Sequence, residues 1–522
     1  MSDEVRESEG ISLLKRGQKG IFHAIFSRMG IMLVLLVVQV MFIFSVFRWF
    51  EEFLPHIIGG TMLFTVIMVL YLLNSRMDPT AKITWLVVIM LLPVFGALFY
   101  WYIRSDIGHK AMRKRIDHLI GETKGLIPQS PETLERLAAQ DPGAASLARY
   151  IARSSGPVYE NTSVTYFPLG EDKFEEMLRR LEQAKEFIFL EYFIIDEGYM
   201  WGKVLEILAR KAKEGVDVRV MYDGMCEFVL LPHDYPKRLK RLGIKCKAFA
   251  PVSPLVSTHY NYRDHRKILV IDGHTAFNGG VNLADEYINH TVKFGHWKDT
   301  AVMIQGEAVK SFTLMFLQMW NMNEPEPEFE RFLNAPAGKG EGFVIPYGDC
   351  PLDDDKVGER VYMDILNRAG QYVYIMTPYL ILDSEMETAL KFAAERGVDV
   401  RLILPGIPDK AAPYALAKTH YASLLDSGIK IYEYTPGFVH AKVFLADDRE
   451  AVVGTINLDY RSLYHHFECA TYMNSVPCIP KIKADFQKTF QSCRQVAKET
   501  IWQGKAGMRI MGTLLKAVAP LL

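Results

Sequence analysis

The stretch HRKILVID at residues 265–272 is followed by GGVN at residues 279–282. The same pattern returns as HAKVFLAD at residues 440–447, followed by GTIN at residues 454–457. Both copies have the spacing H-x-K-x4-D-x6-G-x2-N. One match to a short motif can arise by chance, but two copies in which every offset is identical indicate an internal duplication.

The histidine and the lysine of each copy fall on one face of a predicted strand. His265 and Lys267 are two residues apart, as are His440 and Lys442, and alternate side chains of a strand point the same way. The apolar run after each pair reads as the buried remainder of the strand. One such pair alone is typical of an exposed strand edge. Its duplication favours a shared catalytic site instead.

These residue types suit phosphodiester exchange. The reaction needs a nucleophile, an acid for the leaving oxygen, and cations that face the phosphoryl oxygens. Two histidines and two lysines brought face to face supply all three without a metal ion. We find no Walker loop and no paired zinc spacing, so we predict no metal and no cofactor.

On these motifs the chain resembles the phospholipase D superfamily, whose signature is a duplicated His-Lys-Asp motif. The resemblance implies a two-step exchange through a phosphohistidine. It implies that His265 is the nucleophile and that His440 is the acid and base, although the near symmetry of the copies leaves the reverse order open. It also implies that Asn282 and Asn457 donate to phosphoryl oxygens.

The predicted catalytic set is His265, Lys267, Asp272, His440, Lys442 and Asp447. The predicted supporting set is Gly279, Gly280, Asn282, Asp299, Gly454, Thr455, Asn457 and Glu468.

A catalytic histidine usually needs a carboxylate that holds its tautomer. The aspartates of the two motifs stand at the far ends of their strands. Asp299 and Glu468 each open a later apolar run. We therefore expect Asp299 to orient His265 and Glu468 to orient His440, with a solvated carboxylate at the start of a strand as the open alternative.

The first hundred residues differ in kind from the rest. We predict an amphipathic interfacial segment at 1–29 and membrane spans at 30–47, 54–73 and 83–103, because each span is about the length that crosses a bilayer core of roughly 30 Å. Basic residues flank both ends, so the number of full crossings and the topology stay open. Residues 501–522 are predicted to form an amphipathic helix on a membrane surface, or a plain packed terminal helix.

The remaining chain reads as a connector and two repeats. We predict a helical connector at 104–157, a first repeat at 158–334, a linker at 335–342 and a second repeat at 343–500. The stretches GVDVRV at 215–220 and GVDVRL at 397–402 each follow a helical pattern. Strands that alternate with helices predict an α/β fold with mainly parallel sheets. The resemblance implies that the two repeats are related by a pseudo-twofold axis.

Within the superfamily, the chain resembles the bacterial cardiolipin synthase branch. The stretches that carry this are LEYF at 190–193, NLADEY at 282–287, HWKDT at 296–300 and NLDYRS at 457–462. The pair His465-His466 departs from it, since that branch more often has an uncharged pair there. The resemblance implies transfer of a phosphatidyl group between two phosphatidylglycerol molecules, with membrane phospholipids as partners. We expect a multi-pass protein of the bacterial inner membrane with its catalytic part on the cytoplasmic face.

Composition narrows the alternatives. The chain has 522 residues and a formal net charge of −1, so it lacks the basic field of a nuclease, and we predict no nucleic-acid partner. Six cysteines without a C-x-x-C pair indicate mostly free thiols, with one bridge left open. Both motifs are complete, which argues against an inactive scaffold. A phospholipase D or another phosphatidyltransferase, the acceptor range and a homo-oligomer stay open.

Overall fold

The computed structural model describes residues 41, 44–45, 60–75, 77, 79–91, 96–97, 99–101, 107–251, 262–353, 355–502 and 506–519. The chain forms two compact units. The larger unit holds both repeats, within residues 112–251 and 261–512. The smaller unit holds the described helices before residue 112 and the residues after 512.

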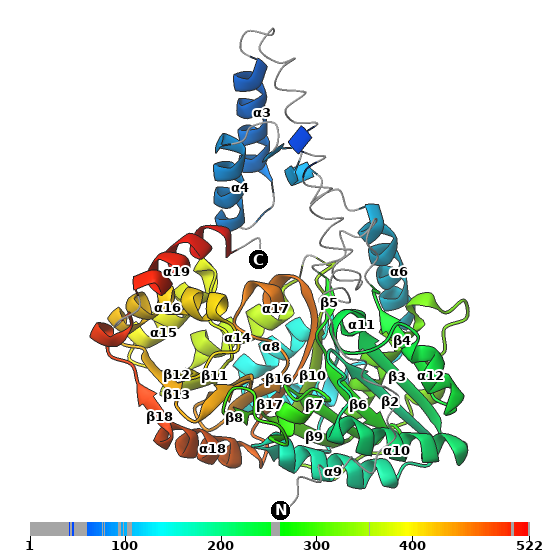
Figure 1. Cartoon of the computed structure of the whole chain (residues 1–522). Helices are drawn as coiled ribbons and strands as arrows, with labels where there is room; N and C mark the ends of the chain where they lie inside the picture. Colours follow the sequence, from blue (N-terminus) through cyan, green and yellow to red (C-terminus); the bar gives the residue numbers. More distant parts are fainter. Residues whose placement is uncertain are drawn as a thin grey trace, which may run out of the picture. The chain divides into compact units, whose positions relative to one another are not determined.

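The first repeat is built on a seven-stranded sheet (Figure 1). Its strands, in spatial order, are β1 (Thr162–Phe167), β9 (Ala301–Gly306), β7 (Thr275–Gly279), β6 (Lys267–Ile271), β2 (Phe187–Tyr192), β3 (Asp217–Asp223) and β4 (Lys245–Phe249).

The second repeat has a sheet with the same order of corresponding strands. These are β10 (Phe343–Asp349), β17 (His466–Asn474), β16 (Glu450–Gly454), β15 (Val443–Ala446), β11 (Tyr372–Met376), β12 (Asp399–Pro405) and β13 (Lys430–Tyr434), and β18 (Cys493–Gln495) is added at the edge. The match of strand order extends the duplication from the motifs to the whole of each repeat.

The sheets are mixed, so the prediction of mainly parallel sheets was wrong. In the first sheet β2–β3 and β3–β4 are parallel and the other strand pairs are antiparallel. In the second sheet β11–β12 and β12–β13 are parallel, and a short strand of the first repeat, β5 (Arg263–Asp264), also pairs in parallel with β17. Each motif strand instead turns back on itself as a hairpin, β6 with β7 and β15 with β16. The three-residue loops at 272–274 and 447–449 use left-handed backbone at Asp272-Gly273 and Asp447-Asp448, a conformation that tight hairpin turns favour.

Helices cover both sheets. One face of the first sheet packs against α9 (Gly170–Glu182), α10 (Tyr199–Lys213) and α12 (Tyr235–Arg241). The corresponding face of the second sheet packs against α14 (Val357–Arg368), α15 (Ser384–Glu395) and α16 (Ala411–Asp426), together with α7 (Pro131–Gln140) and α8 (Pro142–Ile151) of the connector. The connector begins with α6 (Ile107–Thr123).

The inner faces of the two sheets share one apolar cluster, which also includes α13 (Val309–Trp320) and α18 (Ile479–Gln491). Strand β2 shows why its sequence is a continuous apolar run. Ile188 and Leu190 point to the outer cluster and Phe189 to the shared one. In a strand that is buried on both faces, apolar and polar residues do not alternate.

Short elements complete the repeats. They are α11 (Cys226–Val229), η2 (Asp285–Ile288), η3 (Asn321–Asn323), η4 (Glu330–Phe332), α17 (Tyr460–Tyr464) and η5 (Lys498–Thr500). Residues 335–341 form neither helix nor strand, where the linker is predicted. All six cysteines are free thiols.

The smaller unit contains α3 (Gly60–Asn74) and α4 (Pro79–Leu91), which contact each other. Trp85 packs edge-on against Tyr100, with ring centroids 5.1 Å apart. Among the described residues, no helix combines the length and the apolar character needed to cross a membrane. The predicted segment 1–29 and most of the predicted span 30–47 lie outside the described residues, as do parts of 54–73 and 83–103. Near the carboxyl end, α19 (Ala506–Val518) is helical as predicted.

Candidate active site

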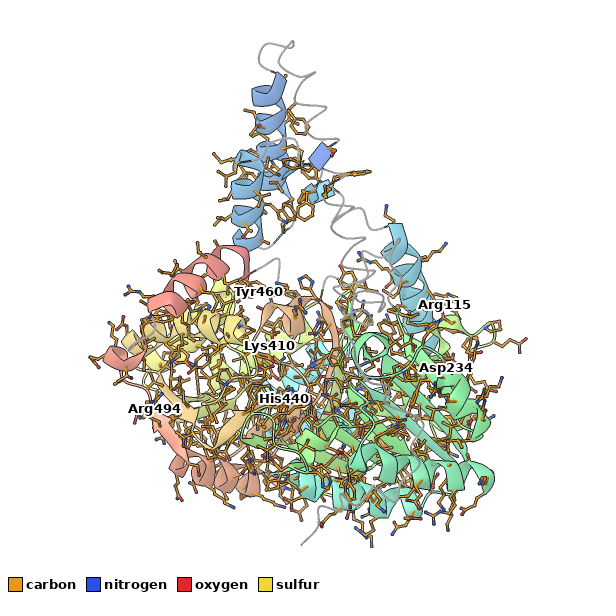
Figure 2. The ribbon with its side chains drawn as sticks, in the orientation of Figure 1. Arg115, Asp234, Lys410, His440, Tyr460 and Arg494 are labelled. Atoms are coloured by element: carbon orange, nitrogen blue, oxygen red, sulfur yellow. The ribbon has the colours of Figure 1, made fainter. Side chains whose placement is uncertain are left out.

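The two motif histidines lie where the repeats meet. His265 stands two residues before β6, and His440 stands three residues before β15. Figure 2 shows His440 at the junction between the first repeat, in green, and the second, in yellow and orange. Each histidine is 7% exposed, and Lys267 and Lys442 are fully buried. The motif side chains are therefore almost entirely buried, and the imidazoles keep a small exposed fraction.

Each histidine is held by a carboxylate of the opposite repeat. His265 Nδ1 lies 2.9 Å and 3.0 Å from the two carboxylate oxygens of Glu468. His440 Nδ1 lies 2.7 Å from Asp299 Oδ2. The two predicted carboxylates are the right ones, but the predicted pairing within each repeat was wrong, because the pairs cross between the repeats.

The backbone explains the crossing. The short strand β5 (Arg263–Asp264) pairs in parallel with the start of β17, so that the His265 amide donates to the Phe467 carbonyl at 3.0 Å. In the same way, β14 (Gly437–Val439) pairs with β8 (His296–Lys298), and the His440 amide donates to the Lys298 carbonyl at 2.7 Å. Each histidine is thus hydrogen-bonded to the residue that directly precedes the carboxylate of the other repeat.

Burial and the neighbouring carboxylates determine the protonation states of His265 and His440. Burial lowers the pKa of His265 to about 3 and that of His440 to about 4. Burial raises the pKa of Asp299, but the interactions with His440, Lys442 and the Thr300 amide together hold this pKa below its usual value. An ionised carboxylate at Nδ1 keeps the proton on that nitrogen, which leaves Nε2 with a free lone pair. That is the form a nucleophile or a general base requires.

The two lysines lie beside the histidines. Lys267 Nζ donates to the His265 carbonyl at 2.6 Å. Lys442 Nζ lies 2.9 Å from His440 Nδ1 and donates to the His440 carbonyl. Burial lowers the pKa of Lys267 to about 8 and that of Lys442 to about 7.

The charges of the two repeats also act on each other. Lys267 contributes to the lowered pKa of His440, after burial and Lys442. Glu468 acts against the lowered pKa of Lys442. The two motifs therefore form one electrostatic unit that could receive one phosphate group.

The small residues of the motifs make room for the carboxylates. A Cβ on Gly280 would lie 2.1 Å from Asp299 Oδ1, and Gly279 has a left-handed φ of 152°. In the second copy the Thr455 hydroxyl donates to Glu468 instead. A Cβ on Gly454 would meet the Ala470 side chain at 2.3 Å.

The two asparagines hold neighbouring structure. Asn282 accepts from the Ile194 amide at 3.0 Å and donates to the Tyr287 hydroxyl at 2.8 Å. The ring of Tyr287 packs edge-on against His440, with centroids 5.3 Å apart. Asn457 donates to Asp459 at 3.2 Å. Their predicted donation to phosphoryl oxygens stays a prediction.

The structure does not bring Asp272 and Asp447 to the histidines. Asp272 accepts from the backbone amides of 185–187 at 2.8–2.9 Å. Asp447 accepts from the amides of 370–372 at 2.7–2.9 Å. Each aspartate fixes the loop that enters the neighbouring strand, so these contacts give it a place in the scaffold.

Two aromatic rings beside the histidines were missed. Trp297 packs on His440 with centroids 5.5 Å apart, and His466 packs on His265 with centroids 5.4 Å apart. Each ring stands two residues before the carboxylate of its repeat. That common offset was visible in the sequence and could have identified both.

A duplicated α/β sheet with a crossed pair of histidines, lysines and carboxylates defines a protein with the phospholipase D fold. The crystal structure of a phosphatidylserine synthase from Haemophilus influenzae Rd KW20 matches with a TM-score of 0.55 over 69% of this chain and 95% of that one. At 14% identity, this similarity shows the fold alone.

Sequence comparison identifies the family. The family model described as "Cardiolipin synthase, PLD-like domain" matches residues 177–320 and 362–493, and the model "Phospholipase_D-nuclease N-terminal" matches 63–104. The chain belongs to the cardiolipin synthase family of the phospholipase D superfamily.

Relatives match over most of their length. An uncharacterized protein of Streptococcus mutans is 59% identical over 457 residues, which are 87% of this chain and 99% of that protein. The cardiolipin synthase of Halalkalibacterium halodurans is 31% identical, over 87% of this chain and 91% of the relative. Cardiolipin synthase 2 of Bacillus anthracis is 33% identical, over 87% and 89%.

Proposed function

We propose that the protein is a cardiolipin synthase that transfers a phosphatidyl group from one phosphatidylglycerol to the terminal hydroxyl of another and releases glycerol. The observation that carries the proposal is the crossed arrangement, in which His265 is held by Glu468 and His440 by Asp299. It offers two oriented imidazoles to one phosphate. The relatives named as cardiolipin synthases suggest which substrate that phosphate belongs to.

In the first step, His265 Nε2 attacks the phosphorus of the donor lipid. The bond between phosphorus and the glycerol oxygen breaks, and His440, whose protonated form the bound phosphate favours, gives its Nε2 proton to that oxygen. The Asp299 carboxylate stabilises the imidazolium that supplies the proton. Free glycerol leaves, and the phosphatidyl group stays on His265 as a phosphohistidine.

In the second step, His440 takes the proton of the acceptor hydroxyl. The acceptor oxygen attacks phosphorus and the bond to His265 breaks, which gives cardiolipin and restores both histidines. Exclusion of water from the enclosed site favours the lipid acceptor over hydrolysis.

Lys267 and Lys442 neutralise the phosphoryl oxygens. Both are buried beside the histidines, where a charge interacts more strongly than it does in water. A phosphate bound there favours the protonated form of each lysine. The chain's own cations thus take the part that a metal ion plays in other phosphoryl transfers, and we propose a metal-independent reaction.

We further propose that the enzyme works on the cytoplasmic face of the bacterial cell membrane. The helices α3 and α4 keep apolar side chains exposed, among them Leu63, Ile67, Leu70, Val87 and Met90. Contiguous exposed apolar side chains mark surfaces that meet lipid or protein. A site held at a membrane meets both lipid substrates at a raised effective concentration.

The test uses the purified full-length protein in mixed micelles, with phosphatidylglycerol as the sole phospholipid and with no added metal or nucleotide. Mass spectrometry follows cardiolipin while free glycerol is assayed in parallel. We expect equal amounts of both. Phosphatidic acid without cardiolipin would replace the proposal by a phospholipase D.

Matched variants control the test. We expect His265→Ala and His440→Ala to abolish turnover, because each removes one of the two imidazoles. The variant His118→Ala changes an exposed histidine on α6 and should retain the rate of the wild type. Normal turnover of either active-site variant would overturn the mechanism.

A further inference from the structure

A third histidine stands beside the proposed nucleophile. His466 begins β17 two residues before Glu468. Candidate ligand atoms of His265, His466 and Glu468 all lie within 4.8 Å of one another. The proposed reaction uses His265 and Glu468 but has no role for His466.

His466 is not hydrogen-bonded at Nδ1 within this group. Its side chain is 10% exposed, and Nδ1 lies 3.7 Å from Glu468 Oε1. That nitrogen has no hydrogen-bond partner in the described part of the chain. A buried polar atom without a partner costs free energy, which a ligand at this position would recover.

The other half of the active site lacks this feature. The position that corresponds to His466, two residues before Asp299, is Trp297. An indole nitrogen is only a donor and does not ligate a metal ion. Of the two halves, the His265 half is therefore the one that has three side chains able to ligate.

Two imidazoles and one carboxylate form a ligand set typical of zinc and similar divalent transition ions. Bonds of about 2.0–2.2 Å in a tetrahedral site place the ligand atoms roughly 3.3 Å apart. His265 Nδ1 lies 2.9 Å and His466 Nδ1 lies 3.7 Å from Glu468 Oε1, so both of these spacings are close to that value. Three protein ligands leave one position open. The nearby charge of Lys267 opposes a cation and should weaken the binding.

We propose that His265, His466 and Glu468 bind one divalent transition ion of the Zn²⁺ class, and that the bound ion reversibly inhibits the enzyme. The inhibition follows because the ion engages the imidazole and the carboxylate that the reaction needs. This second part rests on the proposed function, whereas the binding does not.

The first experiment measures binding alone. Full-length protein in detergent is stripped with a chelator and titrated with Zn²⁺ against a chromophoric competitor. We expect the wild type to bind one equivalent of Zn²⁺. We expect at least tenfold weaker binding for His466→Asn and for His466→Trp, the second of which introduces the residue type found at the corresponding position 297. His465→Asn is the matched control, since His465 lies beside Tyr262, with centroids 6.3 Å apart, and outside the ligand group.

Substitution of Co²⁺ gives an independent readout of geometry. We expect the visible absorption of a low-coordinate nitrogen and oxygen site in the wild type and in His465→Asn, and its loss in His466→Asn. Equal Zn²⁺ affinity in the wild type and both His466 variants would overturn the site, as would the absence of a bound equivalent in the wild type. Thermal unfolding of each variant confirms that a loss of binding is not a loss of fold.

The second experiment measures turnover of phosphatidylglycerol. We expect Zn²⁺ to inhibit the wild type, excess chelator to restore the rate, and His466→Asn to need at least tenfold more Zn²⁺. Equal inhibition of the wild type and His466→Asn would overturn the inhibitory role. If the wild type shows no turnover before Zn²⁺ is added, the proposed function fails while the binding result stands.

Discussion

His265 Nδ1 lies 2.9 Å from Glu468 Oε1, so the histidine of the first motif is held by a carboxylate of the second repeat. The contact between His440 and Asp299 is the reciprocal one. Neither repeat alone therefore contains an active-site histidine together with the carboxylate that holds it. The duplication produces an active site only when its two halves fold against each other.

The carboxylates should matter for rate more than for binding. We expect Glu468→Gln and Asp299→Asn each to lower kcat on the order of 10³–10⁴-fold, as expected when a catalytic histidine loses the acceptor that fixes its tautomer. KM should change little, because the lysines remain. Steady-state kinetics with phosphatidylglycerol provides the check, and a raised KM at full kcat would show that these groups bind substrate instead.

The space at Gly280 should be required. A Cβ there would displace the Asp299 carboxylate from His440, since it would lie 2.1 Å from Oδ1. We expect Gly280→Ala to lower kcat at least 100-fold. Gly121→Ala is the matched control, because a Cβ at that glycine meets nothing within 4 Å. Full activity of Gly280→Ala would mean that Asp299 does not need its observed position.

The motif aspartates should affect stability and not chemistry. Asp272 accepts three backbone hydrogen bonds and has a left-handed φ of 50°. We expect Asp272→Asn, which tolerates that backbone, to lower the free energy of unfolding by about 1–3 kcal/mol. The rate per folded molecule should stay near that of the wild type. A large loss of kcat in fully folded protein would restore the aspartate to the catalytic set.

Substrate binding should weaken as the pH rises. Burial lowers the pKa of Lys442 to about 7 and of Lys267 to about 8, so both lysines lose their charge between pH 7 and 9. The bound phosphate favours protonated lysine, which means that binding takes up protons and affinity falls with rising pH. We expect KM to rise by up to about tenfold per pH unit for each lysine that loses its proton.

The variant Lys442→Arg separates this effect from others, because arginine stays charged in the same range. Its KM should rise less steeply above pH 7 than that of the wild type. A KM of the wild type that is constant from pH 7 to 9 would contradict the assignment of the lysines to the phosphate.

The sequence predicted the residues of the site better than the contacts between them. The motif spacing identified the histidines and lysines, because strand periodicity is local. Which carboxylate meets which histidine depends on how the two repeats pack, through β5 on β17 and β14 on β8. Short parallel pairings between distant segments leave no periodic pattern, so the predicted pairing came out reversed.

For the fold as well, the local patterns were predicted correctly and some of the strand pairings were not. The repeated helix and strand patterns gave the α/β class, and the glycines that end α10 and α15 have the same φ of 95°, at Gly215 and Gly397. The hairpins of the motif strands were missed. Their turns contain Asp272-Gly273 and Asp447-Asp448, and the first of these is a known hairpin signal. Reading it would have predicted mixed sheets.

The most direct test of the central claim is to locate the covalent intermediate. Wild-type protein is mixed with a stoichiometric amount of phosphatidylglycerol, quenched in base within one turnover, digested, and mapped by mass spectrometry. The same is done with His265→Ala and with the exposed control His118→Ala. We predict a phosphatidyl adduct on His265 in the wild type and in the control, and no adduct in His265→Ala. Cardiolipin formed within that turnover without an adduct on either His265 or His440 would contradict a phosphohistidine mechanism.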